Sequence, residues 1–432
     1  MSGHDPYAPE SGDPSFDVES YDLALDYRVR TNRLDGRATI NAVAAVATSS
    51  IALDLIGLRA TRVRVDGDRR TTFRQGPRKL RVTLPRRMQP GERFSIEVAY
   101  AGAPAPRRSR WGAIGWEELD DGALVASQPT GAPTWFPCND RPDDRARMRL
   151  SVTTDAGYLP VPTGRPVSLS TAHGKVTAVA ESSVPVATYL AAVHVGRYTA
   201  EQLPGDRRVR LVAPPALRKQ AELAFAEVPA MLQLFEHAFG TYPQEDCTLV
   251  VTPDVLEIPL EAQGLAVFGV NHLHPDEHRL IAHELSHQWF GNSVGVGRWR
   301  DIWLNEGFAC YAEWLWSEES GGPTLTQKAA KHHGRLAALA QDLTLGDPGP
   351  DLMFDDRVYK RGALTLYALR CIIGAELFAR VVAEWTSAHR HALATSEDLR
   401  ALAARVSGHD LEALFRAWLD ETPLPPFPNP AR

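Results

Sequence analysis

The hydrophobic pattern of the chain changes its period near residue 200. Between Phe16 and Tyr198, short segments such as YDLALDYRV, KLRVTL and RFSIEVAY alternate apolar and polar residues, and Asp-Gly and Pro-Gly turn sequences separate them. A period of two is typical of strands that bury one face. We therefore predict a mostly antiparallel β-domain over residues 16–202, preceded by a disordered N-terminus at residues 1–15.

The second part of the chain has a helical period instead. After Pro214, apolar residues recur at helical spacing in EHRLIAHELSHQWFG, GALTLYALRCIIG and SEDLRALAARVSG, and each of these segments ends at a glycine. Glycine is the preferred residue just after a helix. Two strand-like segments, CTLVVTP and GLAVFG, precede the first of them. We predict a mainly helical domain over residues 203–432 and an α+β multidomain fold overall.

Composition argues against several classes of partner. The net charge is −6 at pH 7, and no run of Lys and Arg predicts a basic face, so we expect no nucleic-acid partner. No eighteen consecutive residues are apolar and the N-terminus has no signal-peptide pattern, so we expect a cytoplasmic protein without a membrane partner. The four cysteines form no Cys-x-x-Cys pair, which argues against a thiolate metal site.

One motif predicts a metal site. His283 and His287 are four residues apart on a predicted helix, so both imidazoles leave the same face. Eighteen residues separate His287 from Glu306, which lies in the apolar segment WLNEGFACYAEWLW, where a buried carboxylate needs a cation. We predict that these three side chains bind one zinc ion per chain and leave a fourth position for water. A chance occurrence of His-Glu-x-x-His is the alternative, and Glu306 argues against it.

The residues around this motif resemble a known family. HELSHQWFGNSV and WLNEGFACYAEWLW are similar to the zinc signature of the aminopeptidase N family, the gluzincins that include leukotriene hydrolase. WFPCNDRPDDRARMRLSVT resembles the Phe-Pro-Cys-x-Asp-x-Pro segment of the family, and RVYKRGALTLYALR resembles its Tyr-x-Lys-Gly helix. The resemblance covers about residues 15–425 and implies a short member without the C-terminal helical domain of longer ones. It implies a thermolysin-like zinc peptidase domain after the β-domain, with peptides that have a free N-terminus as substrates.

The resemblance also implies a role for individual residues. Glu284 matches the general base, and Tyr359 matches the tyrosine that stabilises the oxyanion. Glu261 lies where the family has the glutamate of Gly-x-Met-Glu-Asn, which binds the α-amine of the substrate, and Gln128 matches a glutamine of the amine subsite. The segment departs from the family at three positions, since Ile258, Leu260 and Ala262 replace glycine, methionine and asparagine. Arg361 replaces the lysine of the Tyr-x-Lys-Gly helix, and we expect a structural role for it.

Each assignment has a plainer alternative. Glu261 is alternatively a solvated charge on an edge strand, and Tyr359 is alternatively a packing residue on a helix face. Asp301 is either a partner of a zinc-binding histidine or the N-cap of the helix that follows it. For the whole protein, the alternatives are a zinc endopeptidase, a hydrolase of a non-peptide substrate such as an epoxide, or a binding protein on an inactive peptidase fold. The last is disfavoured, because the metal ligands, the base and the tyrosine are all present.

Overall fold

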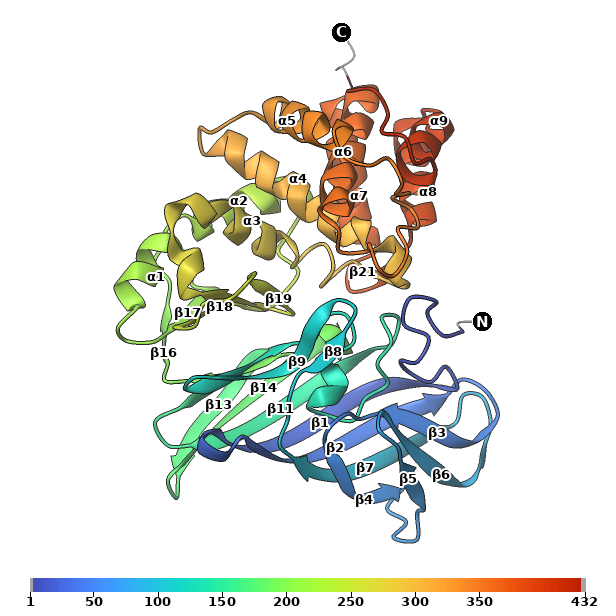
Figure 1. The fold of residues 1–432 in the computed structure, drawn as a ribbon, viewed down its shortest axis with the longest axis vertical. Helices are drawn as coiled ribbons and strands as arrows, with labels where there is room; N and C mark the ends of the chain where they lie inside the picture. The colour runs from blue at the N-terminus through green and yellow to red at the C-terminus, as the bar shows by residue number, and fades with distance from the viewer. Residues whose placement is uncertain (1–2, 429–432) are drawn as a thin grey trace. The chain divides into compact units, whose positions relative to one another are not determined.

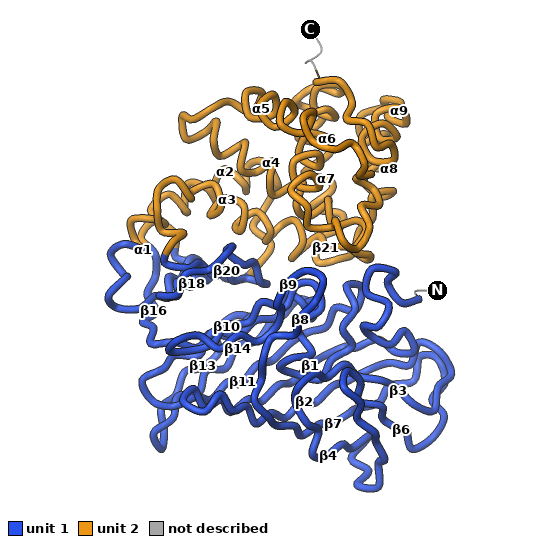
Figure 2. Tube along the Cα trace, in the orientation of Figure 1, with its two compact units in different colours: residues 1–203, 207–221, 245–270 blue, residues 204–206, 222–244, 271–432 orange. Residues whose placement is uncertain are grey.

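A computed structural model describes residues 3–428, which form two compact units (Figure 2). The first unit contains residues 3–203, 207–221 and 245–270, and the second contains residues 204–206, 222–244 and 271–428. The units are therefore not consecutive segments of the chain. The domain boundary between residues 202 and 203 stays a prediction.

A seven-stranded sheet forms the largest part of the first unit (Figure 1). Its order is β13-β14-β11-β1-β2-β7-β4, and all neighbours are antiparallel except β1 and β11. In β1, alternate residues from Tyr21 to Tyr27 are buried, as the period of two predicts. The predicted β-rich N-terminal part is confirmed. The strands are β1 Phe16–Arg28, β2 Arg33–Ala44, β4 Arg59–Val65, β7 Arg93–Gly102, β11 Arg145–Asp155, β13 Arg165–Ala172 and β14 Lys175–Ala187.

Three smaller groups of strands complete the first unit. One sheet has the order β3-β6-β5, a second β12-β15-β10-β9-β8, and a third β16-β17-β18-β20-β19. The strands of the first are β3 Thr48–Asp54, β5 Phe73–Gln75 and β6 Lys79–Met88, and those of the second are β8 Arg107–Ser109, β9 Gly112–Leu119, β10 Gly122–Ala126, β12 Leu159–Pro162 and β15 Val193–Gly196. Those of the third are β16 Thr199–Gln202, β17 Val209–Ala213, β18 Cys247–Thr252, β19 Leu260–Ala262 and β20 Leu265–Gly269.

The third of these sheets contains the two strands predicted between residues 203 and 270. The segments CTLVVTP and GLAVFG form β18 and β20, which pair in parallel and are buried along their whole length. Parallel strands covered on both faces have continuous apolar sequences, which explains why these two do not alternate. The short strand β19 pairs antiparallel with β20 at the end of the sheet, so Glu261 lies on an edge strand, as predicted.

The second unit is mainly helical (Figure 1). Its helices are α2 Val228–Phe239, α3 His278–Ser286, α4 Trp303–Glu319, α5 Leu325–Ala337, α6 Asp356–Ile373, α7 Ala375–Ala388, α8 Ser396–Ser407 and α9 Glu412–Phe415, while α1 Arg218–Ala224 spans the boundary between the units. The predicted glycine ends are confirmed for α6 at Gly374 and for α8 at Gly408, whereas the one at Gly291 is wrong, because α3 ends at Ser286. None of the helices within residues 3–428 has both the length and the apolar character needed to cross a membrane.

A pair of glycines allows α4 and α6 to approach each other closely. A methyl group on Gly307 would lie 2.8 Å from the Cα atom of Gly362, so a side chain at either position would push the two helices apart. Gly307 follows Glu306 in α4, and Gly362 lies three residues after Tyr359 in α6. The close crossing therefore brings together the two helix segments that carry predicted site residues.

The predicted disorder of residues 1–15 is wrong for residues 3–15; residues 1 and 2 lie outside the described part of the chain. The Gly12 amide donates to Asp54 Oδ2 at 2.8 Å, and the Asp13 amide donates to Asn139 Oδ1 at 2.7 Å. Lys79 Nζ donates to the Gly12 carbonyl at 2.7 Å. The polar N-terminal sequence is therefore held by partners far along the chain, which composition does not reveal.

A buried carboxyl group in the first unit predicts a stability that depends on pH. Asp140 is 2% exposed and accepts a hydrogen bond from the Thr188 hydroxyl at 2.7 Å. Burial, together with the nearby Asp54 carboxylate, raises the pKa of Asp140 from its usual 3.8 to about 7. Because the folded protein retains this proton while the unfolded chain loses it, the contribution of Asp140 to stability falls as the pH rises from about 4 to about 7. At 1.36 kcal/mol per pH unit, the loss is roughly 4 kcal/mol.

Asp140→Asn should therefore raise the free energy of unfolding by about 1–3 kcal/mol more at pH 8 than at pH 5, because an amide carries no charge at either pH. Urea unfolding at the two pH values measures this difference. Asp22→Asn is the matched control, since the Asp22 side chain is 54% exposed. An equal effect of Asp140→Asn at both pH values would contradict the prediction.

Candidate active site

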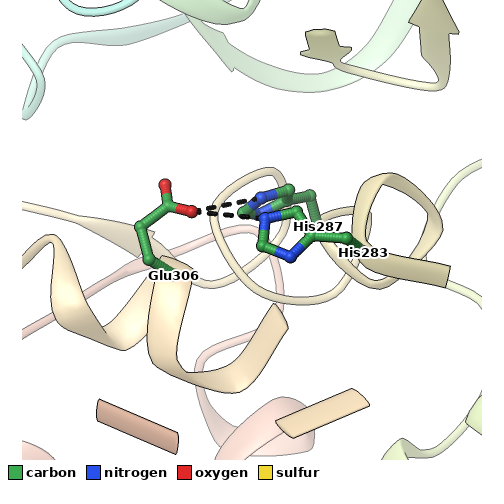
Figure 3. A group of neighbouring side chains, drawn as sticks. All are labelled: His283, His287 and Glu306. Atoms are coloured by element: carbon green, nitrogen blue, oxygen red, sulfur yellow. Dashed lines mark ion pairs between the residues drawn. The ribbon is translucent and has the colours of Figure 1, made fainter. Parts of the chain in front are cut away.

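Helices α3 and α4 bring the three predicted metal ligands together in the second unit (Figure 3). His283 lies in α3, His287 follows its last residue, and Glu306 lies in the first turn of α4. Glu306 Oε2 is 3.5 Å from the Nε2 atom of each histidine. All three residues are at most 8% exposed, so the site is shielded from bulk water.

The donor set fits one zinc ion. One atom from each of the three residues lies within 4.8 Å of the others. Zinc binds nitrogen and oxygen donors at about 2.0–2.2 Å, and tetrahedral donors at that distance lie about 3.4 Å apart, close to the separations seen here. Burial acts to raise the pKa of Glu306, but the neighbouring His287 and His283 rings outweigh it and hold that pKa below its usual value. The carboxylate is therefore the form available to a metal ion, as predicted from its apolar surroundings.

Each histidine is oriented by a hydrogen bond on its other nitrogen. His283 Nδ1 is 2.9 Å from Glu313 Oε1, and His287 Nδ1 is 3.0 Å from the Phe290 carbonyl oxygen. An acceptor at Nδ1 places the ring proton there, so the Nε2 lone pairs are directed toward Glu306. The arrangement of both rings is thus set before a metal ion binds.

The partner of His283 is Glu313, which the sequence analysis did not identify. Both alternatives considered for Asp301 are wrong. Its Oδ1 accepts hydrogen bonds from the backbone amide and hydroxyl of Ser396, so Asp301 caps the start of α8, while Ile302 is the N-cap of α4. Glu313 lies seven residues after Glu306 on α4, which is two turns along the same helix face. This spacing is the signal in the sequence from which Glu313 is predictable.

Glu284 and Tyr359 also lie in the second unit. Glu284 follows His283 in α3 and is 4% exposed. The Tyr359 ring in α6 is nearly parallel to the His283 ring, at 15°, with 6.1 Å between centroids. Tyr359 is only half-buried, unlike core residues of the two helices such as Phe308 in α4 and Leu366 in α6, which are fully buried. The tyrosine therefore lies beside a predicted metal ligand rather than in the packed core.

Glu261 and Gln128 form a pair in the first unit. The Gln128 side-chain amide donates a hydrogen bond to Glu261 Oε1 at 2.8 Å, across 133 positions in the sequence. Glu261 lies on the edge strand β19, and Gln128 follows β10. The hydrogen bond fixes one carboxylate oxygen of Glu261 and is a contact that sequence spacing does not predict.

Arg361 has the structural role expected for it. The side chain is buried, and its guanidinium group donates to the carbonyl oxygens of Trp418 at 2.9 Å, Glu421 at 2.6 Å and Thr422 at 2.7 Å. Several carbonyls near the end of the chain are thus satisfied by one side chain of α6. Five donors in a planar fork suit this task better than a single ammonium group.

Two histidines of a His-Glu-x-x-His helix and a glutamate of the next helix form the donor set that defines gluzincins. Residues 223–418 match the sequence profile of the Peptidase family M1 domain, and residues 17–190 match that of the Peptidase M1 N-terminal domain. A crystal structure of an M1 zinc metallopeptidase from Deinococcus radiodurans superimposes with a TM-score of 0.91 at 30% identity, and the match covers 100% of both chains. The chain therefore belongs to peptidase family M1.

Relatives known from sequence are longer. Leucyl aminopeptidase of Saccharolobus solfataricus is 24% identical over 94% of this chain and 54% of its own length. Aminopeptidase M1-B of Oryza sativa subsp. japonica is 29% identical over 70% of this chain and 37% of its own length. The part of the chain that matches these plant and archaeal relatives spans about a third to a half of their length.

Proposed function

We propose that the protein is a zinc-dependent aminopeptidase that removes the N-terminal residue from peptides. The observation that carries the proposal is the buried donor set of His283, His287 and Glu306, with Glu284 adjacent to a ligand in α3. The family supports it, since the relatives described above include aminopeptidases from an archaeon and a plant.

In the proposed reaction, water adds to the scissile carbonyl and the C–N bond then breaks. A bound zinc ion supplies a Lewis acid for the carbonyl and lowers the pKa of water to about 7. Glu284 accepts the proton of the attacking water and delivers it to the leaving nitrogen, which departs as an amine. The Tyr359 hydroxyl donates a hydrogen bond to the carbonyl oxygen as that oxygen gains negative charge. The burial of Glu284 favours this role, because water competes less for the carboxylate.

We propose that Glu261 selects substrates with a free N-terminus by pairing with the ammonium group. The hydrogen bond from the Gln128 amide to Oε1 fixes the orientation of the Glu261 carboxylate, which would pair with the ammonium group. A structure of the Deinococcus M1 metallopeptidase, 31% identical with a TM-score of 0.92, is described as bound to a Tyr-Ser-Ala substrate. That tripeptide supports peptides as the substrate class.

Glu261→Gln should lower kcat/KM for an aminoacyl anilide by about 10- to 100-fold, because a hydrogen bond to a charged group contributes about 1.5–3 kcal/mol. Hydrolysis of the N-acetylated anilide, which has no ammonium group, should stay low and unchanged. The measurement compares both substrates with both proteins at equal zinc content. Phenanthroline should abolish wild-type hydrolysis and added zinc should restore it.

A zinc endopeptidase or a non-peptide hydrolase on the same scaffold is the second candidate. The three family positions replaced by Ile258, Leu260 and Ala262 favour it, since they flank the residue proposed to select the amine. In that case, Glu261→Gln would not affect free-amine substrates selectively, and acetylated peptides would be cleaved as fast as free ones. Chelator-resistant turnover would argue against both candidates.

A further inference from the structure

A layer of charged side chains lies on the Nδ1 side of His283, opposite its metal-directed nitrogen. Glu313 Oε1 is 2.9 Å from His283 Nδ1 and 3.5 Å from Cys310 Sγ. Two cations lie near the same carboxylate, with Lys360 Nζ at 4.0 Å from Oε1 and Arg279 Nη1 at 3.6 Å from Oε2. Glu313 is 7% exposed, so its charge depends on these neighbours for compensation.

The two cations differ in their access to water. The Lys360 side chain is 12% exposed and its Nζ is also 3.0 Å from Cys310 Sγ, whereas the Arg279 side chain is 50% exposed. An exposed ion pair contributes little, because solvent and salt screen it. A shielded pair interacts more strongly, since the local dielectric constant is lower. Lys360 is therefore the principal counter-charge of Glu313.

We propose that Lys360 is a positioning residue for the metal centre and that it acts through Glu313. Its ammonium group holds the Glu313 carboxylate against Nδ1 of His283, so that Nε2 of this ring stays directed at Glu306. Lys360 follows Tyr359 in α6, and the same helix therefore carries the proposed oxyanion donor and the charge that stabilises a metal ligand. This inference rests on the proposed zinc site.

The sign of the change in zinc affinity on removal of Lys360 distinguishes positioning through Glu313 from direct electrostatic repulsion. A lysine near a dication repels it, so its removal would strengthen zinc binding if the two charges interacted only through space. Positioning through Glu313 predicts weaker zinc binding instead, because Glu313 without its counter-charge holds the His283 imidazole less firmly. Loss of a group that orients a metal ligand typically weakens metal binding by 10- to 100-fold.

Lys360→Met should weaken zinc binding about 10- to 100-fold, measured by competition with a chromophoric chelator. Arg279→Met removes the same charge beside the same carboxylate from a half-exposed position, and it should change the affinity less than threefold. The visible spectrum of the cobalt-substituted protein should change in Lys360→Met and not in Arg279→Met, because it reports ligand geometry. If thermal unfolding shows that metal-free Lys360→Met does not fold, the same measurements are made on Lys360→Gln.

A double-mutant cycle tests the route through Glu313. Glu313→Gln alone should weaken zinc binding, and Lys360→Met in the Glu313→Gln background should add less than a twofold effect, because the carboxylate it compensates is absent. Unchanged or tighter zinc binding in folded Lys360→Met or Lys360→Gln would overturn the inference, as would additive effects in the cycle. Failure of the wild-type protein to bind zinc would instead overturn the zinc site itself.

Discussion

Glu284→Gln should lower kcat by about 10³-fold or more while one zinc ion stays bound to each chain. General acid and base catalysis contributes typically 10²- to 10⁴-fold, and Glu284 is proposed to serve both proton transfers. Glutamine has nearly the same shape, but its amide does not accept a proton at neutral pH. Because Glu284 is not one of the three proposed zinc ligands, the zinc content should not change. Steady-state hydrolysis of an aminoacyl anilide and metal analysis of the same sample measure the two quantities.

Glu277→Gln is the matched control for this variant. Glu277 lies directly before α3, where it is the N-cap residue, and the substitution removes the same charge from the same segment of chain. Its kcat should stay close to that of the wild-type protein. If Glu284→Gln retained more than a tenth of the wild-type kcat, Glu284 would not be the general base.

The parts of the structure that depend on local spacing were predictable from sequence. Alternation in YDLALDYRV predicted β1, and the spacing of His283 and His287 placed both imidazoles on one helix face. Glu306 was predictable because a carboxylate in an apolar helix needs a cation. This prediction does not require knowledge of how far Glu306 lies from the histidines in the fold. The alternation in β1 and the spacing of the two histidines are short sequence patterns. The prediction for Glu306 depends only on that residue and its neighbours in sequence.

Contacts between distant segments were not predictable in the same way. The Gln128 and Glu261 hydrogen bond joins positions that no repeat relates, and the order of residues 3–15 depends on partners such as Asn139. For Asp301, the position before α4 suggested either a partner of a zinc-binding histidine or a cap of that helix, whereas its carboxylate accepts hydrogen bonds from Ser396 at the start of α8. Secondary structure and the candidate metal ligands follow from local chemistry, while the groups that orient them require the tertiary fold.

Tyr359→Phe should lower kcat by about 10²- to 10³-fold and change KM by less than about threefold. The hydroxyl is proposed to act on the oxygen that becomes negative during the attack, and loss of one such donor typically has this effect on the rate. An interaction made only in the transition state lowers kcat and leaves substrate binding almost unchanged. The parallel packing of the Tyr359 ring with that of His283 should survive, because phenylalanine keeps the ring.

Tyr367→Phe is the matched control, because it removes a hydroxyl group from the same helix. The Tyr367 hydroxyl donates to Thr326 Oγ1 at 3.1 Å, in a contact between α6 and α5, so its loss should affect stability slightly and kcat very little. Higher KM with unchanged kcat in Tyr359→Phe would place the Tyr359 hydroxyl in ground-state binding instead. If neither constant changed, the ring of Tyr359 would serve only to pack against His283, and zinc alone would have to stabilise the developing charge.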